Sequence, residues 1–149
     1  MAHFAVRILS PLPADQAWAR ILDLRAHSAV IPLTTLTGDI LYAAGLVPGS
    51  RFVARTALGP IGFDDSMVVD EVTQPTAGHG AWARIRKEGK AIRGLIELTI
   101  TPQGTGSRVE WSQDISVRGI PRVFDPVVAR VARAAYGTTL RKLLARTPA

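Results

Sequence analysis

Asp65 is a side chain whose type and position could serve acid–base chemistry. It lies in the strand-like stretch 63–72, where alternation puts four residues on one face: Phe63, Asp65, Met67 and Val69. This face is the more apolar of the two, so we expect it to point inward. A carboxylate buried alone is costly unless it is neutralised or paired. Asp65 is therefore a candidate acid or base, or an anchor for a ligand hydroxyl.

A structural role for Asp65 is the alternative, and we prefer it: an ion pair with an arginine such as Arg84, or a solvated position at a strand edge. Arg84 itself lies in the stretch 81–87, whose pattern leaves its orientation open. If Trp82 faces a cavity, Arg84 does too and could bind a ligand carboxylate or carbonyl. If the opposite face of this strand is the inner one, Arg84 is a surface residue.

Three further side chains could position or protonate a ligand. Trp111 and Gln113 share the apolar face of the stretch 108–117, the clearest period-two pattern in the chain. Trp111 suits the core, whereas the amide of Gln113 needs polar partners and is a candidate for orienting a ligand. Tyr136 could protonate an enolate, although a tyrosine with one solvated edge is the more ordinary interpretation. His27 fits a helix end or the surface better than a general base.

Other kinds of site find no support in the sequence. The chain has no cysteine, and it contains no metal-ligand spacing, nucleophile elbow or phosphate-binding loop, so we expect no metal and no cofactor. The formal net charge is +6, but the arginines are dispersed, so we expect solvated surface charge and no nucleic-acid partner. We expect no signal peptide and no integral membrane segment, and a cytoplasmic location.

Hydrophobic periodicity and turn residues predict one α+β domain over residues 1–149. A strand is followed by a helix, a short helix or turn, six strands and a long final helix. The expected strands are 4–9, 35–43, 51–58, 63–72, 81–87, 91–101 and 108–117, and the expected helical segments are 13–24, 25–32 and 121–146. Six hairpin-linked strands predict an antiparallel sheet, and the final helix is the only element long enough to cover it.

The middle of the final helix is rich in alanine, glycine and threonine, so it either packs tightly on the sheet or leaves a cavity. Its apolar residues fall on two faces rotated by roughly a third of a turn. One face contains Phe124, Val127, Val128, Val131 and Ala135, and the other contains Tyr136, Leu140, Leu143 and Leu144. We therefore predict a bend or a rotation of contacts near Gly137, with the first half of the helix over a pocket and the second half anchored by leucines.

This element order resembles the helix-grip fold of the START and Bet v 1-like superfamily, and within it the bacterial polyketide cyclase/dehydrase-type members, often grouped as SRPBCC domains. The likeness rests on short motifs spread over nearly the whole chain: residues 13–18 leading to Asp23, His27 with 31–32, 49–52, 59–67, Gly94 and Trp111. It implies a curved antiparallel sheet wrapped around a long C-terminal helix, with a hydrophobic tunnel between them. Members of the superfamily bind lipids, sterols, polyketides or plant hormones, and some catalyse aldol-type cyclisation or dehydration.

Together these observations predict a protein, monomeric or homodimeric, that binds a hydrophobic small molecule such as a lipid, polyketide or aromatic compound. The expected ligand-binding residues are Phe52, Phe63, Asp65, Met67, Trp82, Arg84, Trp111, Gln113, Phe124, Val128, Ala132 and Tyr136. One alternative is a cyclase or dehydratase with Asp65, Arg84 and Tyr136 as catalytic candidates, assisted by Gln113. Another is a module whose apolar groove accepts a second protein chain.

Overall fold

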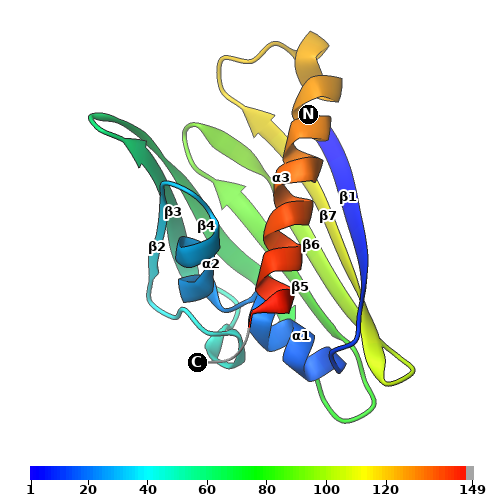
Figure 1. Cartoon of the computed structure of the whole chain (residues 1–149). Coiled ribbons are helices and arrows are strands. Elements are labelled where there is room, and N and C mark those ends of the chain that lie inside the picture. The colour runs from blue at the N-terminus through cyan, green and yellow to red at the C-terminus, as the bar shows by residue number, and fades with distance from the viewer. Residues whose placement is uncertain (147–149) are drawn as a thin grey trace.

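A seven-stranded antiparallel sheet forms the main layer of the computed structural model, which describes residues 1–146 (Figure 1). The last three residues of the predicted domain, 147–149, lie outside the described residues. The sheet order is β1-β7-β6-β5-β4-β3-β2. Its strands are β1 (Ala2–Ser10), β2 (Thr34–Gly38), β3 (Arg51–Leu58), β4 (Ile61–Thr73), β5 (Ala81–Glu88), β6 (Ile92–Gln103) and β7 (Gly106–Val117).

The helices are α1 (Ala14–Ile21), α2 (Leu24–Val30) and α3 (Asp125–Ala145), with 3-10 turns η1 (Ala43–Gly45) and η2 (Arg122–Phe124). The predicted α+β order and the helix-grip arrangement are confirmed. One predicted strand is too long, because β2 ends at Gly38 instead of Ala43. A Cβ at Gly38 would lie 2.7 Å from the carbonyl oxygen of Arg51, so the chain leaves the sheet after a close backbone approach.

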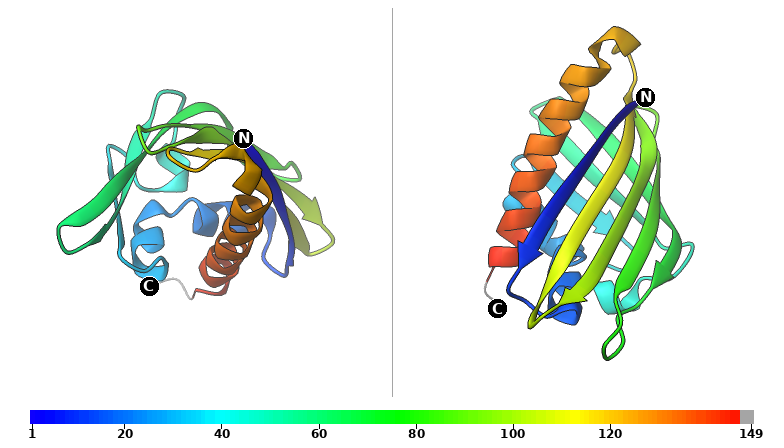
Figure 2. Two further views of the ribbon diagram at one scale, coloured as in Figure 1. Left: turned by 90° about the horizontal axis from the view of Figure 1, so that it is seen from above. Right: turned by 90° about the vertical axis from the view of Figure 1, so that its right-hand side faces the viewer.

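The short helices α1 and α2 close one end of the curved sheet (Figure 2). Trp18 on α1 is buried, and its indole Nε1 donates to Gln74 Oε1 at 2.9 Å, while Gln74 Nε2 donates to the carbonyl of Ala43 at 2.9 Å. The carboxylate of Asp23 accepts from the backbone N–H of Ala26 and caps α2. These bonds tie the two helices and the η1 loop into a closed base.

The long helix α3 lies on the concave side of the sheet and packs mainly against β1, at the sheet edge (Figures 1 and 2). Leu140 and Leu143 are each 1% exposed, which confirms the predicted leucine anchor. The helix α3 runs without a break from Asp125 to Ala145, so the bend or rotation of contacts predicted near Gly137 does not interrupt it. That glycine faces β1, where an added Cβ would lie 3.9 Å from Val6 Cγ1.

The position of α3 determines where the interior stays open. Because α3 follows the β1 edge, it leaves much of the concave face between β3 and β6 without a covering helix. The first half of α3 is correspondingly exposed: Phe124 is 51% and Val127 58% accessible, so the prediction that this half roofs a pocket is wrong for both. Only the middle of the helix borders the open space.

Gly94 in β6 provides a test of the sheet curvature. Its φ is +156°, and an added Cβ would lie 1.9 Å from the carbonyl oxygen of Asp114 on β7. We expect Gly94→Ala to lower the free energy of unfolding by about 3 kcal/mol or more, because two paired backbones must separate. The control Gly104→Ala also has a positive φ but open space around it, and should cost only about 1–2 kcal/mol. Urea unfolding measures both, and equal losses would contradict this account.

Candidate ligand-binding cavity

A cavity of about 430 Å³ lies between the concave face of the sheet, the middle of α3 and the helix α2. Most of its lining is apolar. The lining residues are Leu22, Leu24, His27, Ile31, Thr34, Leu36, Phe52, Ala54, Thr56, Phe63, Asp65, Met67, Ile85, Lys87, Ile92, Ile96, Trp111, Ile115, Val131, Ala135, Tyr136, Thr139 and Leu140. The predicted hydrophobic cavity between the sheet and the final helix is therefore present.

An ion pair between Lys87 and Asp65 is the main polar feature of this cavity. Lys87 Nζ donates to Asp65 Oδ2, and the two residues are only 3% and 8% exposed. The sheet brings them together because Lys87 on β5 is paired with Met67 on β4, which lies on the same inner face as Asp65. Lys87 Nζ also lies 3.8 Å from the sulfur of Met67. Two charges are thus held in surroundings that are otherwise apolar.

Lys87 is protonated at neutral pH. Burial alone would lower its pKa, but its interactions with Tyr136 and Asp65 raise it by more, so the pKa of Lys87 lies above the ordinary lysine value. An ammonium has three donors and no lone pair. Lys87 is therefore equipped to donate hydrogen bonds or to stabilise negative charge, and not to act as an amine nucleophile.

Asp65 has an oxygen available to a ligand. Its Oδ1 is buried and has no hydrogen-bond partner among residues 1–146, while Oδ2 is occupied by Lys87. A buried acceptor without a partner costs about 1–3 kcal/mol, and a ligand that donates a hydrogen bond would remove that cost. Since Asp65 lines the cavity, such a donor can approach from the cavity side.

Tyr136 completes the polar group from the helix side. Its ring centroid lies 5.9 Å from Lys87 Nζ, and the ring packs against Phe4 and Trp111 at centroid distances of 5.4 Å. These aromatic contacts hold the Tyr136 ring in place between α3 and the sheet. Asp65, Lys87 and Tyr136 therefore come from β4, β5 and α3 and converge in one cavity.

His27 contributes a neutral imidazole to the cavity lining. Its Nε2 lies 2.7 Å from the carbonyl oxygen of Ile21, so this nitrogen carries the proton and donates. Burial lowers the pKa of His27, although the bond to Ile21 and the charge of Asp23 partly oppose that effect. In this tautomer Nδ1 is an acceptor. His27 lies in the last turn of α2, which agrees with the expected helix-end position. It also lines the cavity, so it is not a surface residue.

Several predicted ligand-binding residues do line the cavity. These are Phe52, Phe63, Asp65, Met67, Trp111 and Tyr136. Sequence reasoning missed Lys87, although strand alternation carries a signal for it. Lys87 continues the face of Ala81, Ala83 and Ile85, and these three residues are at most 2% exposed. A lysine at the end of a small, apolar strand face is the pattern that could have identified it.

The prediction that Trp82 and Arg84 face the cavity is wrong, because the other face of β5 is the inner one. The Arg84 guanidinium lies 5.2 Å from the Trp82 ring centroid and 3.4 Å from Glu97 on the outer surface of the sheet. This cation–π contact with Arg84 stabilises the Trp82 ring on the outer surface of the sheet. The predicted Arg84 partner for Asp65 is wrong for the same reason, since Lys87 takes that place.

Gln113 is inside the protein but does not line the cavity. It is 1% exposed, and its Oε1 accepts from Trp111 Nε1 at 3.0 Å. Its Nε2 is buried with no partner among the described residues. Trp111, which does line the cavity, is thus held in place by Gln113 behind it, and the amide supports the cavity wall instead of a ligand.

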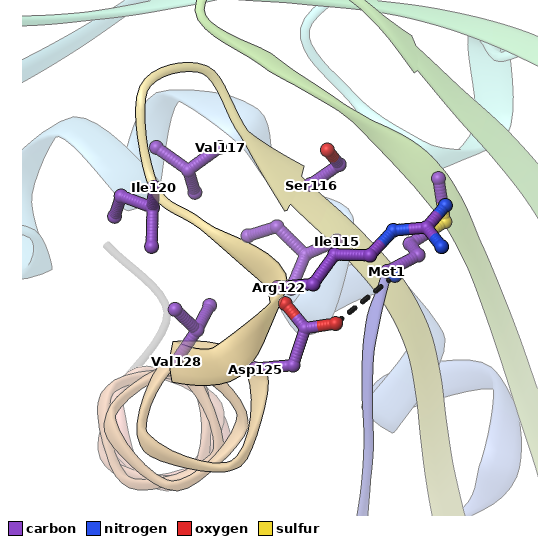
Figure 3. Close-up of a pocket in the computed structure, with 8 residues that line it drawn as sticks. All are labelled: Met1, Ile115, Ser116, Val117, Ile120, Arg122, Asp125 and Val128. Atoms are coloured by element: carbon purple, nitrogen blue, oxygen red, sulfur yellow. Dashed lines mark hydrogen bonds and ion pairs between the residues drawn. The ribbon is translucent and has the colours of Figure 1, made fainter.

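Phe124, Val128 and Ala132 also lie outside the cavity, because the first half of α3 follows β1. Ala132 is buried, whereas Phe124 is half exposed. Figure 3 shows Val128 at a separate hollow of about 120 Å³, beside Ile120 and the ion pair between Asp125 and the N-terminal amine. Of the face assigned to the pocket from helical periodicity, only Val131 and Ala135 line the cavity.

Within residues 1–146, no three His, Cys, Asp or Glu side chains are grouped so that they could hold a metal ion. Nor does this part of the chain contain a helix both long enough and apolar enough to span a membrane.

The sequence matches one family model over residues 1–147, described as polyketide cyclase/dehydrase and lipid transport. This match confirms the resemblance inferred from the short motifs. No curated protein sequence matches the chain.

Solved structures with the same fold cover nearly the whole chain at low sequence identity. Protein TTHA0849 from Thermus thermophilus is 14% identical, with a TM-score of 0.69 over 95% of this chain and 94% of that one. The human StarD13 lipid transfer and protein localization domain is 10% identical, with a TM-score of 0.73 over 97% and 78%. The ZhuI aromatase/cyclase from Streptomyces sp. R1128 is 11% identical, with a TM-score of 0.64 over 99% and 96%. At these identities the likeness shows the fold alone.

The Lys87–Asp65 pair can be tested through stability. We expect Lys87→Met to lower the free energy of unfolding by about 3–5 kcal/mol, because Asp65 stays buried without its cation. The double variant Lys87→Met, Asp65→Leu removes both charges and should recover most of that loss. Urea unfolding at pH 8 measures the difference, and an undiminished loss in the double variant would contradict the pairing.

The same pair has a defined pH dependence. Because folding raises the pKa of Lys87, its contribution is fully present below the unfolded lysine pKa of 10.5 and is lost as pH rises through the higher folded value. We therefore expect the unfolding free energy of the wild type to fall relative to the double variant above about pH 10.5.

Proposed function

The chain belongs to the polyketide cyclase/dehydrase and lipid transport family, and from its cavity we propose that it binds one amphipathic small molecule, such as a lipid, polyketide or aromatic compound. The observation that carries this proposal is an apolar cavity containing one buried ion pair. A volume of about 430 Å³ lies within the range of small-molecule sites, roughly 300–1,000 Å³. A cavity of this kind supports a small molecule better than a groove for a second protein chain.

The polar groups indicate what the ligand must offer. Asp65 Oδ1 accepts a hydrogen bond, and the Lys87 ammonium donates one, so the proposed ligand carries a hydroxyl close to a carbonyl, carboxylate or second oxygen. A pure hydrocarbon would displace water from Asp65 and Lys87 without making hydrogen bonds in its place. Binding of such a ligand is therefore disfavoured.

The position of the pair also orients the ligand. Phe63 is partly exposed at the cavity mouth, which we call the rim, and Asp65 follows two residues later on the same face of β4. The Asp65 carboxylate therefore lies roughly 7 Å deeper in the cavity than Phe63. The cavity continues beyond the pair to Leu22 and Leu24 near its closed base. We propose that the polar group of the ligand binds near the entrance and its apolar body occupies the deeper part. We propose the cytoplasm as its location, in keeping with a chain that has no cysteine.

A second candidate function is dehydration or aldol-type cyclisation, which the convergence of Asp65, Lys87 and Tyr136 favours. With a β-hydroxyketone, the Asp65 carboxylate would remove the proton between the ketone and the hydroxyl-bearing carbon. The Lys87 ammonium would stabilise the enolate oxygen, and Tyr136 would donate a proton to the hydroxyl that leaves as water. The products are the enone and water, and the proton on Asp65 returns to Tyr136.

Binding can be tested by filling the cavity from α3. Both Ala134 and Ala135 are exposed, but only Ala135 lines the cavity. We expect Ala135→Trp to abolish, or weaken at least ten-fold, the binding of a fluorescent apolar probe such as 1-aminoanthracene, and to remove thermal stabilisation by hydroxylated lipids or aromatic polyketides. Ala134→Trp should bind like the wild type. Binding that survives in both variants would place the site elsewhere, and no binding in the wild type would end the proposal.

Catalysis can be tested with an aromatic β-hydroxyketone, whose dehydration to the enone is followed by absorbance. Asp65→Asn and Tyr136→Phe should each slow the reaction by about 100-fold or more, while product binding by Tyr136→Phe stays within a few-fold of wild type. Arg84→Gln on the outer face is the control and should leave the rate unchanged. A wild-type rate no faster than that of buffer would leave binding as the function, and an equal loss in Arg84→Gln would contradict the assigned roles.

A further inference from the structure

Large exposed apolar side chains gather at the end of the molecule opposite the closed base. One group lies on the β3–β4 hairpin and the other on the β7–α3 loop and the first half of α3, which Figure 1 shows at the same end. We call these residues the entrance surface: Leu58, Ile61, Phe63, Ile120, Val123, Phe124, Val127 and Val131, each 42–78% exposed. Ile61 and Val123 are the most exposed, at 78% and 77%.

The entrance surface is continuous with the cavity. Phe63 on the hairpin side and Val131 on the α3 side both line the cavity and are 42% and 64% exposed. An apolar molecule that passes between these two side chains therefore stays in contact with apolar surface from the outside to the interior.

Positive charge lies at the same end of the sheet. Lys90, Arg93 and Arg118 surround a shallow depression where the β5–β6 turn meets the end of β7, and the backbone N–H of Arg118 donates to the carbonyl of Ala91 at 2.8 Å. Arg122 follows at the nearby hollow shown in Figure 3. Within residues 1–146, none of these four cations has a carboxylate within ion-pair distance.

Three carboxylates of this region already have cationic partners, and Asp114 on β7 is bonded to His3. Asp64 pairs with Arg55 at 2.9 Å, Glu88 pairs with Arg51 and Arg86, and Asp125 pairs with the N-terminal amine at 3.1 Å. The charge of the basic depression is therefore not offset by its neighbours. This end of the molecule combines exposed apolar side chains with net positive charge.

We infer that the entrance surface docks on a bilayer containing anionic phospholipid, with the cavity mouth facing the lipid. Apolar side chains beside lysine and arginine match an interface that has acyl chains next to phosphates. Nucleic acid would use the cations but not the exposed aliphatic side chains. A protein interface is a poorer match, because interface cores are depleted in lysine, whereas here Lys90 and its neighbours lie between the two apolar groups. The inference does not depend on which molecule the cavity holds.

Vesicle co-sedimentation of the full chain tests this docking. At 50 mM salt we expect binding to phosphatidylcholine vesicles with about 30% phosphatidylglycerol, much weaker binding without the anionic lipid, and a loss of affinity as salt increases. The triple variant Lys90→Gln, Arg93→Gln, Arg118→Gln should bind on the order of 100-fold more weakly. The double variant Ile61→Asn, Val123→Asn should lose about ten-fold or more.

Matched controls carry the same changes elsewhere. Arg133→Gln, Arg141→Gln, Lys142→Gln removes three exposed cations from α3, and Leu9→Asn, Val47→Asn alters two exposed apolar residues far from the entrance surface. Both controls should bind vesicles like the wild type, and circular dichroism should show all variants folded.

Several outcomes would overturn the inference. One is the absence of wild-type binding to the anionic vesicles, and another is an equal loss in the matched controls. Tighter binding to single-stranded RNA than to vesicles would assign the basic depression to nucleic acid. A dimer in solution that the Ile61→Asn, Val123→Asn variant converts to monomer would assign the entrance surface to a second copy of the chain.

Discussion

A single helix cannot cover the concave face of a seven-stranded sheet, and the rest of this structure depends on that mismatch. The helix α3 packs mainly against β1, and Leu140 and Leu143 in its second half are buried. The strands farther from β1 then curve around a space that no helix fills. Because α1 and α2 close one end of that space, the unfilled region becomes a cavity, and the exposed Phe63 and Val131 are part of its lining.

The buried ion pair places two charges and an unpartnered acceptor in an otherwise apolar cavity. Removing Lys87 and Asp65 from water costs free energy that their mutual attraction and the interaction of Lys87 with Tyr136 offset, so losing one member of the pair is costly. The bond engages one carboxylate oxygen and leaves Asp65 Oδ1 open to the cavity. A fully apolar lining of the same shape would avoid this cost and would accept any hydrophobic molecule. The pair is therefore better explained by ligand recognition than by stability alone.

The fold was largely predictable from the sequence because it follows from local patterns, whereas half of the predicted site was not. Alternation in β7 correctly placed Trp111 and Gln113 inside. In β5 the two faces carry conflicting signals, since Trp82 looks like a core residue and Lys87 like a surface residue. The choice is made by neighbours distant in sequence: Glu97 draws Arg84 outward, and Asp65 holds Lys87 inside. The face of α3 that meets the cavity likewise depends on which strand the helix follows, and helical periodicity does not contain that information.

Apolar and polar side chains alternate along the path from the entrance surface to the base of the cavity. Moving inward from the rim, a ligand first meets the exposed rings and aliphatic side chains of the entrance surface, then the Lys87–Asp65 pair, and finally the apolar base near Leu22. An amphipathic molecule that enters with its apolar end first keeps its polar group outside until its apolar part is buried. In the proposed orientation, its polar group would then reach the ion pair at roughly 7 Å depth and would exchange bonds with water for bonds with Asp65 and Lys87. Because the polar group of the proposed ligand would never be buried without a partner in this order, the depth of the pair would determine the orientation of the ligand as well as its chemistry.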